Sequence, residues 1–391
     1  MSDFISNLHP SAEINDIRVI NDFKGITFSN YKHLDVKNEL IQSLLNSKIE
    51  PACYWGAEMV CSGHFSELWE TILFFYSKYV HIGNPKMAIY IEMRLNIFKS
   101  ILNSGYSENE LLLRNNSKIR HIFAEILTIL CLGKRKHTFH SIVMKTSDFE
   151  MSTMSEKMRA TNVEFIKDIF LEDDAKELFI AANELAFCIT KNICDVVLAC
   201  HWLEWMIEYE RKCKQKKEKC ECQRRSNMNV DSKYQKETIW LIWNILLKES
   251  LKRNAFIQKV VDSLLTLFCI RYTSSTTKKR KYILYFVISL ICENIQFTKS
   301  EEIIKESQKH IVTNVLQKVD VIYKQIKKNE KAPRTDYLFM HHQKDDKNNN
   351  LQKSLNKMNQ LNEIDLQQRH SESNNNNNIV EQITNSLEEK K

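Results

Sequence analysis

Residues 50–94, EPACYWGAEMVCSGHFSELWETILFFYSKYVHIGNPKMAIYIEMR, decide the fold because they contain the clearest helix boundaries in the chain. Pro51 suits the first turn of a helix, where its missing N–H costs nothing. Gly63 can end that helix in a left-handed conformation, and Ser66 can cap the next one. The tripeptide Gly83-Asn84-Pro85 combines a helix stop, an N-cap and a first-turn proline. The stretch therefore predicts three consecutive helices joined by short corners.

The composition of the whole chain favours an all-α protein. Its 391 residues include only six glycines and four prolines, so turns are rare. Eleven cysteines and no signal peptide are typical of reduced thiols in the cytosol or nucleus. The longest apolar run, Ile283–Cys292, has about half the length of a membrane span, so we expect no membrane contact. The net charge of +7 permits an anionic partner without requiring one.

Working outward from the central stretch, we expect further segments of different character. Residues 1–35 contain clusters of β-branched residues, which predict a short extended arm or a small hairpin. Apolar residues recur at helical spacing in 36–133 and again in 173–328, which predicts two helical domains. The polar residues 134–172 would connect these domains through short helices.

The second predicted domain begins with a long helical pattern at 173–211. A charged stretch follows at 212–235, which we expect to be an exposed basic linker, and helical patterns then resume. Residues 329–391 are rich in Asn and Lys and predict a disordered tail. The expected fold is an irregular multi-helix array of about ten helices, with the N-terminal arm and the C-terminal tail at its ends.

The third helix of the central stretch carries one charged residue on an apolar face. Arg94 lies between Tyr90 and Phe98 at helical spacing. A partly buried guanidinium needs a carboxylate partner, and the preceding helices offer two. We therefore predict an ion pair between Arg94 and Glu58 or Glu70. On the same helix, an apolar stripe recurs at four-residue spacing: Ile89, Met93, Ile97 and Ile101.

Two basic clusters could contact nucleic acid. They consist of Lys134-Arg135-Lys136 after one predicted helix and Lys278-Lys279-Arg280-Lys281 at the beginning of another. Such runs can contact phosphates independently of sequence, although solvated charge is the simpler interpretation. Lysines at a helix N-terminus are unfavourable to the helix dipole, which makes the second cluster the more interesting one.

The cysteines do not predict a metal site or a cofactor. Cys188, Cys194 and Cys200 are spaced by six, so on a helix each is rotated by about 240° from the last and the thiols diverge. A second group, Cys213, Cys220 and Cys222, lacks the paired C-x-x-C spacing of zinc knuckles.

No established catalytic motif occurs in the sequence. There is no phosphate-binding glycine loop and no zinc-protease or nucleophile-elbow motif. Cys53, Cys61 and His64 could be considered a nucleophile and base. However, both cysteines share the apolar face of a short helix, where buried and inert thiols are usual. We therefore expect no enzyme, and a cysteine-dependent activity is the least favoured alternative.

The tryptophans flank the basic stretch in two equally spaced pairs. Trp202 and Trp205 precede 212–235, and Trp240 and Trp243 follow it. If the stretch simply reverses the chain, the two helices run antiparallel and the four rings meet in one aromatic core. The alternative is an exposed platform for stacking a ligand or a base.

Three runs carry a resemblance to a known family. FKGITFSNYK, KIEPACYWGAEMVCSGHFSELWE and HIGNPKMAIYIEMR, all within residues 23–100, resemble uncharacterised proteins of the nucleocytoplasmic large DNA viruses, the giant-virus group. That resemblance implies a viral source, with localisation in the infected-cell cytoplasm or the virion. Residues 54–57 (YWGA), Gly63 and 83–85 (GNP) also resemble the helical C-terminal domain of clamp-loader-related ATPases, which helps those proteins to oligomerise.

Three functions follow as hypotheses. The first is a non-enzymatic interaction or scaffold protein of a large DNA virus, with a viral protein as its partner. The second is a nucleic-acid-binding accessory factor in replication or transcription, as the clamp-loader likeness implies. The third is the cysteine-dependent enzyme.

Overall fold

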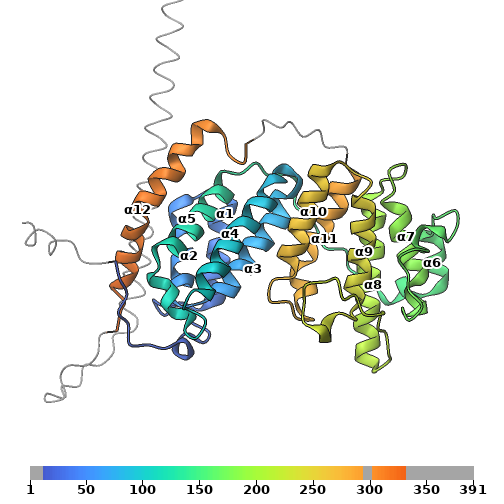
Figure 1. Cartoon of the computed structure of the whole chain (residues 1–391), viewed down its shortest axis with the longest axis horizontal. Helices are drawn as coiled ribbons and strands as arrows, with labels where there is room; N and C mark the ends of the chain where they lie inside the picture. The colour runs from blue at the N-terminus through green and yellow to red at the C-terminus, as the bar shows by residue number, and fades with distance from the viewer. Residues whose placement is uncertain (1–11, 294–301, 332–391) are drawn as a thin grey trace, which may run out of the picture. The chain divides into compact units, whose positions relative to one another are not determined.

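The three helices expected from residues 50–94 are present in the computed structural model of the chain (Figure 1). They are α2 (Ile49–Cys61), α3 (Phe65–Phe75) and α4 (Lys86–Asn103). Gly63 has a φ of +75°, the left-handed conformation expected of a residue that ends a helix. Ser66 does not cap α3, because the helix already begins at Phe65, with His64 at its N-cap position.

The structure describes residues 12–293 and 302–331. This part of the chain is all-α, as predicted, and its nearest approach to a sheet is one isolated bridge between Ile26 and Lys32. Most of the predicted tail, residues 332–391, lies outside the described residues. The other α-helices are α1 (His33–Leu45), α5 (Ser117–Leu132), α6 (Met151–Lys157), α7 (Phe179–Cys188), α8 (Val196–Lys216), α9 (Thr238–Ser250), α10 (Ala255–Phe268), α11 (Thr276–Cys292) and α12 (Lys309–Lys327). A π-turn extends α3 (Tyr76–Val80), and single 3-10 turns occur at Ile20–Phe23, His81–Gly83, Glu110–Asn115, Thr146–Phe149, Glu164–Ile166, Lys176–Leu178, Ser232–Tyr234 and Glu306–Gln308.

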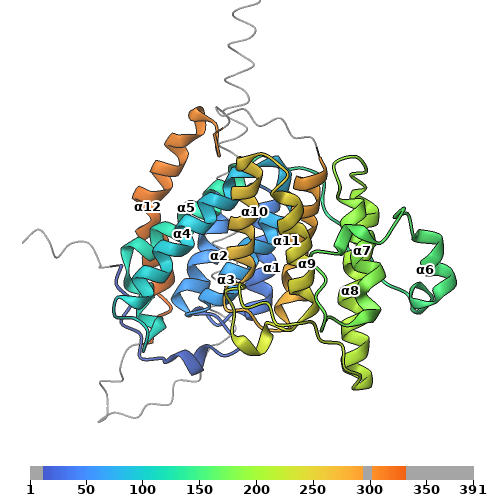
Figure 2. The ribbon, with the colours of Figure 1, turned by 45° about the vertical axis from the view of Figure 1, so that its right-hand side comes forward.

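The innermost helix is α11. Every side chain from Ile283 to Ile291 is buried, as expected of a helix that is apolar on all sides. It packs against α3 on one side and against α8, α9 and α10 on the others (Figures 1 and 2). Each large apolar side chain buried in this way stabilises the fold by roughly 1.5–3 kcal/mol, so α11 holds the two halves of the chain together.

The chain does not divide at 134–172 as we expected, because all described residues belong to one compact unit. The last helix of the described residues, α12, returns to lie beside α5 and α2 (Figure 1). There the guanidinium of Arg120 lies 4.1 Å from the ring centroid of Tyr323 and pairs with Asp320 at 2.9 Å. These contacts join segments that we had assigned to separate domains.

The N-terminal segment is neither a free arm nor a regular hairpin. Phe23 and Phe28 are fully buried, and a tight turn between them and α1 is closed by a 2.8 Å hydrogen bond from Thr27 N to Tyr31 O. The backbone N–H and hydroxyl of Ser29 both donate to the buried carboxylate of Glu58. The turn is therefore part of the core. Residues 1–11 lie outside the described residues.

The long helix expected at 173–211 is two helices. The chain breaks between α7 and α8, where Cys194 takes a φ of +51°, and Asp195 then caps α8 by accepting a hydrogen bond from Leu198 N at 2.9 Å. Spacing of apolar residues continued across this break, so periodicity alone did not reveal it.

The stretch 212–235 is not an exposed linker. α8 extends into it as far as Lys216, and both Cys220 and Cys222 are buried beyond the helix. Arg225 reaches inward and forms a buried, two-pronged ion pair with Asp174. The guanidinium of Arg225 is therefore bound to a carboxylate inside the protein, whereas an exposed linker would leave it in water.

Arg94 is half-buried, but its partner is Glu125 of α5, at 2.7 Å. The predicted pairing with Glu58 or Glu70 is wrong because each of those carboxylates is bound elsewhere, Glu58 by Ser29 and Glu70 by Arg280. The choice of partner depends on α5, which follows the central stretch and covers this part of α4.

Part of the apolar stripe on α4 is exposed. Met93 is 59% exposed and Ile97 is 39% exposed. α4 instead buries the neighbouring face, which includes Ile91 and Leu95, because α10 and α5 pack there.

All four tryptophans beside 212–235 are buried, which confirms the core interpretation over an exposed platform. The rings do not form the single cluster that we expected. Trp205 stacks on Tyr209 with ring centroids 5.0 Å apart, whereas Trp240 packs on Tyr272 at 4.8 Å. Each pair thus makes its ring contacts with residues other than the opposite pair.

Candidate functional site: a lysine-rimmed groove

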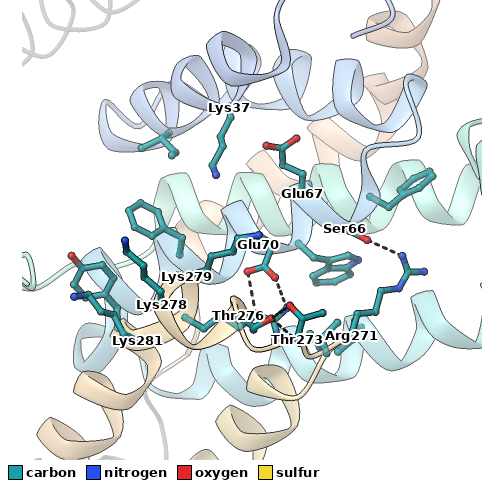
Figure 3. A pocket seen from close by; sticks show the side chains of 18 of the residues that line it. Lys37, Ser66, Glu67, Glu70, Arg271, Thr273, Thr276, Lys278, Lys279 and Lys281 are labelled. Atoms are coloured by element: carbon teal, nitrogen blue, oxygen red, sulfur yellow. Dashed lines mark hydrogen bonds and ion pairs between the residues drawn. The ribbon is translucent and has the colours of Figure 1, made fainter. Parts of the chain in front are cut away.

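A groove of about 930 Å³ lies where α1, α3 and α4 meet the corner between α10 and α11 (Figure 3). Its floor is apolar and comes from these three helices and that corner. We call it the lysine-rimmed groove. The floor residues are Ile41, Phe65, Trp69, Phe74, Leu95, Phe98, Leu102 and Ile270.

Four lysines surround this floor: Lys37 on α1, Lys99 on α4, and Lys278 and Lys279 on α11. Figure 3 shows Lys37 pointing into the hollow from one side and Lys279 from the other. Within residues 12–293 and 302–331, none of the four forms a hydrogen bond or an ion pair. Their ammonium groups are therefore available to an incoming anion.

The acidic side chains of the groove are already paired inside the protein. Glu67 contacts His33 at 3.0 Å, and Glu70 binds the guanidinium of Arg280. Arg280 compensates the charge of Glu70, so among the described residues Glu67 is the one carboxylate lining the groove that can offset the four lysines. The rim therefore carries a net positive charge.

The predicted cluster 278–281 is split between the surface and the interior. Lys278 and Lys279 are exposed at the groove, but Arg280 is only 4% exposed and donates to Glu70. Lys281 forms an ion pair with Glu204 at 2.8 Å. Successive residues of a helix point about 100° apart, so four consecutive cations cannot all face one surface.

The other predicted cluster lies elsewhere and does not line the groove. Arg135 donates to the carbonyl oxygens of Leu44 and Leu45, so it holds the end of α1 in place. Lys134 and Lys136 are exposed. The two predicted basic clusters therefore do not line the same groove.

Cys53, Cys61 and His64 do not form a nucleophile and base pair. Burial raises the pKa of the Cys53 thiol to about 12 and that of Cys61 well above its ordinary value. The Nε2 atom of His64 lies 2.8 Å from the carbonyl oxygen of Ile26. The two thiols are thus held in the unreactive form, and the imidazole is engaged with the backbone.

The described part of the chain contains no group of three or more His, Cys, Asp or Glu side chains placed to hold a metal ion. Nor does that part contain a helix with the length and hydrophobicity needed to cross a membrane. Comparisons of the chain with family models, curated proteins and solved structures found no match.

Sequence reasoning missed Lys37 and Lys99, which come from helices far from the basic runs. One signal could have suggested Lys37. Leu34, Lys37 and Ile41 recur at the spacing of one helix face, and this mixed stripe is visible in the sequence. In the structure its first residue, Leu34, is 58% exposed. An apolar and basic stripe that stays partly exposed indicates an unfilled contact surface.

Proposed function

We propose that this chain is a non-enzymatic helical interaction protein that docks a partner protein in the lysine-rimmed groove. The observation that carries the proposal is the combination of an apolar floor with four lysines that have no internal partner in the described residues. Grooves between helices with apolar floors are a common mode of peptide recognition. Charged rims around such floors direct association and select the partner.

The resemblance of residues 23–100 to giant-virus proteins supports a more specific proposal. On that basis the partner is a viral protein, and the complex forms in the cytoplasm of the infected cell or in the virion. The fold contributes a rigid support, since α3, which supplies Phe65, Trp69 and Phe74 to the floor, packs on the buried α11.

Site-specific photo-crosslinking in cells that express the chain tests the docking function. Benzoylphenylalanine replaces Asn38, an exposed residue of the groove, and Val321 of α12 serves as the exposed control. We expect a discrete protein adduct from position 38 alone, and its loss when Lys37 and Lys279 are changed to Glu. Equal crosslinking from both positions, or a nuclease-sensitive adduct, would reject protein docking at the groove.

Nucleic-acid binding is the second candidate function, supported by the exposed Lys278 and Lys279 side by side at the beginning of α11. If they contact phosphates, Lys278→Gln with Lys279→Gln weakens DNA binding. It also reduces the slope of log K against log salt by about 0.9 per lost contact. Arg280 and Lys281 are excluded from this test because they hold internal partners. An unchanged slope rejects this alternative.

A further inference from the structure

We propose that the occupant of the lysine-rimmed groove is an amphipathic helix of the partner protein, apolar on the inserted face and acidic along both flanks. This inference rests on the proposed docking function and adds the chemistry of the partner.

The placement of the rim charges suggests an elongated ligand with acidic groups on both sides. Lys37 projects from α1, while Lys278 and Lys279 project from α11 on another side of the hollow (Figure 3). Lys99 adds a charge from α4. A helix has the same arrangement when its apolar stripe is flanked by carboxylates, so its stripe can cover the floor while its flanks meet the lysines.

The floor extends along α1 in a way that suits a helix. Lys37 and Ile41 line the groove, and Leu34 lies one turn before Lys37 on the same face. Because Leu34 is 58% exposed, it offers an apolar contact just beyond the groove. A ligand with apolar residues on successive turns could cover both Ile41 and Leu34.

Charge complementarity favours carboxylates as the ligand's polar groups. Arg271, the remaining exposed cation of the groove, already binds Glu110 at 2.6 Å and Ser66 at 2.7 Å. The four free cations are all lysines, which act as mobile point charges rather than as the flat forks that bind phosphate in two-pronged fashion. They can therefore follow carboxylates spaced along a helix.

The aromatic floor disfavours a nucleic acid. Phe65, Trp69 and Phe98 are nearly fully buried and pack on one another with ring centroids 5.7 Å apart in the Phe65–Phe98 and Trp69–Phe98 pairs. Base stacking needs exposed ring faces, and these faces are covered. A phosphate backbone would also leave uncovered the floor side chains that are partly exposed, Ile41, Phe74 and Leu102.

The test measures binding of fluorescent peptides to the full chain. The probe is an 18-residue helical peptide with Leu at i, i+3, i+4 and i+7 and Glu on both flanks. Three probes serve as controls: a Lys-flanked version of the peptide, a scrambled version of the same composition, and a single-stranded 20-nucleotide DNA. We expect the Glu-flanked peptide to bind about tenfold or more tightly than each of these. The Lys-flanked peptide is repelled by the rim, the scrambled peptide has no continuous apolar stripe, and the DNA has no apolar face for the floor.

Variants of the chain locate the binding. The double substitution Lys37→Glu, Lys279→Glu should weaken binding of the Glu-flanked peptide about tenfold. Leu34→Gln should weaken its binding less. Lys118→Glu with Lys259→Glu changes two exposed lysines outside the groove and should have no effect. No saturable binding of the Glu-flanked peptide, or equal binding of the scrambled one, overturns the acidic helix. In that case a protein crosslink from position 38 would still support docking of a different partner.

Discussion

Arg280 on α11 binds the carboxylate of Glu70 on α3, with its Nε 3.1 Å from Oε2 and a second hydrogen bond from its terminal nitrogen. The two residues are 210 positions apart in the chain. Arg280 also donates to the carbonyl oxygen of Phe268 at the end of α10. This one side chain therefore joins three helices at the wall of the lysine-rimmed groove and neutralises a carboxylate that would otherwise repel an acidic ligand.

Removal of this guanidinium should destabilise the fold. We expect Arg280→Ala to lower the free energy of unfolding by about 2–4 kcal/mol, because it leaves Glu70 without its partner and empties a buried position. Lys279→Ala is the matched control on the next residue and should change stability by less than about 0.5 kcal/mol. Urea unfolding of both variants measures these free energies. Equal stabilities would contradict the finding that Arg280 is buried and paired while Lys279 is exposed.

The buried pair between Arg225 and Asp174 gives a second prediction. Asp174→Ala should destabilise the chain by about 3–5 kcal/mol, since it leaves a buried guanidinium unpaired. The control is Asp168→Ala, which removes the exposed partner of Lys248 and should leave stability unchanged. If Asp174→Ala unfolds at the same urea concentration as the parent, then 212–235 is the loose linker that we first expected.

The separation of the tryptophan pairs predicts additive effects. Trp205 donates from Nε1 to Asp148 O at 2.9 Å, and Trp240 donates to Tyr234 O at 2.7 Å. Each Trp→Phe change leaves a carbonyl without its donor and should cost about 1–3 kcal/mol. The double variant should equal the sum within about 0.5 kcal/mol. A coupling energy well above this value would mean that the pairs do meet in one cluster.

His81 should make stability depend on pH. Burial lowers its pKa to about 4, and its ring stacks on Phe139 with centroids 4.1 Å apart. Between pH 6.5 and 4 the unfolded chain binds this proton and the folded chain does not. Stability therefore falls as the pH drops through that window. From pH 7 to pH 5 the loss due to His81 should be about 2 kcal/mol.

The comparison that isolates this residue uses His81→Gln, which cannot titrate. Urea unfolding at pH 7 and pH 5 should show that the parent's advantage over the variant shrinks at pH 5. An advantage that stays constant or grows would show that His81 is protonated in the folded protein.

The fold was predictable from the sequence where neighbours along the chain determine it. Gly63 ends α2 because a left-handed residue suits that corner, and Pro85 directly precedes α4. The break at Cys194 was not predictable, because apolar spacing continues through it while the backbone turns. Local patterns thus located the helices better than they located the interruptions between them.

The partners of buried charges could not be predicted, because they come from distant segments. Arg94 had two acidic candidates nearby in sequence, yet Glu125 lies closer once α5 packs on α4. For the same reason, the sequence showed Lys278 and Lys279 as one half of a basic run. Only the tertiary structure, in which residues of α1, α4 and α11 line one groove, shows that Lys37 and Lys99 lie around the same floor as Lys278 and Lys279.

The most direct test of the central claim is a charge-swap experiment at the lysine-rimmed groove. Binding of the Glu-flanked and Lys-flanked peptides is measured for the parent chain and for the Lys37→Glu, Lys279→Glu double variant. Docking of a charged helix at this groove predicts that the variant loses affinity for the Glu-flanked peptide and gains affinity for the Lys-flanked one. If the variant binds both peptides as the parent does, the groove is not where the helix docks.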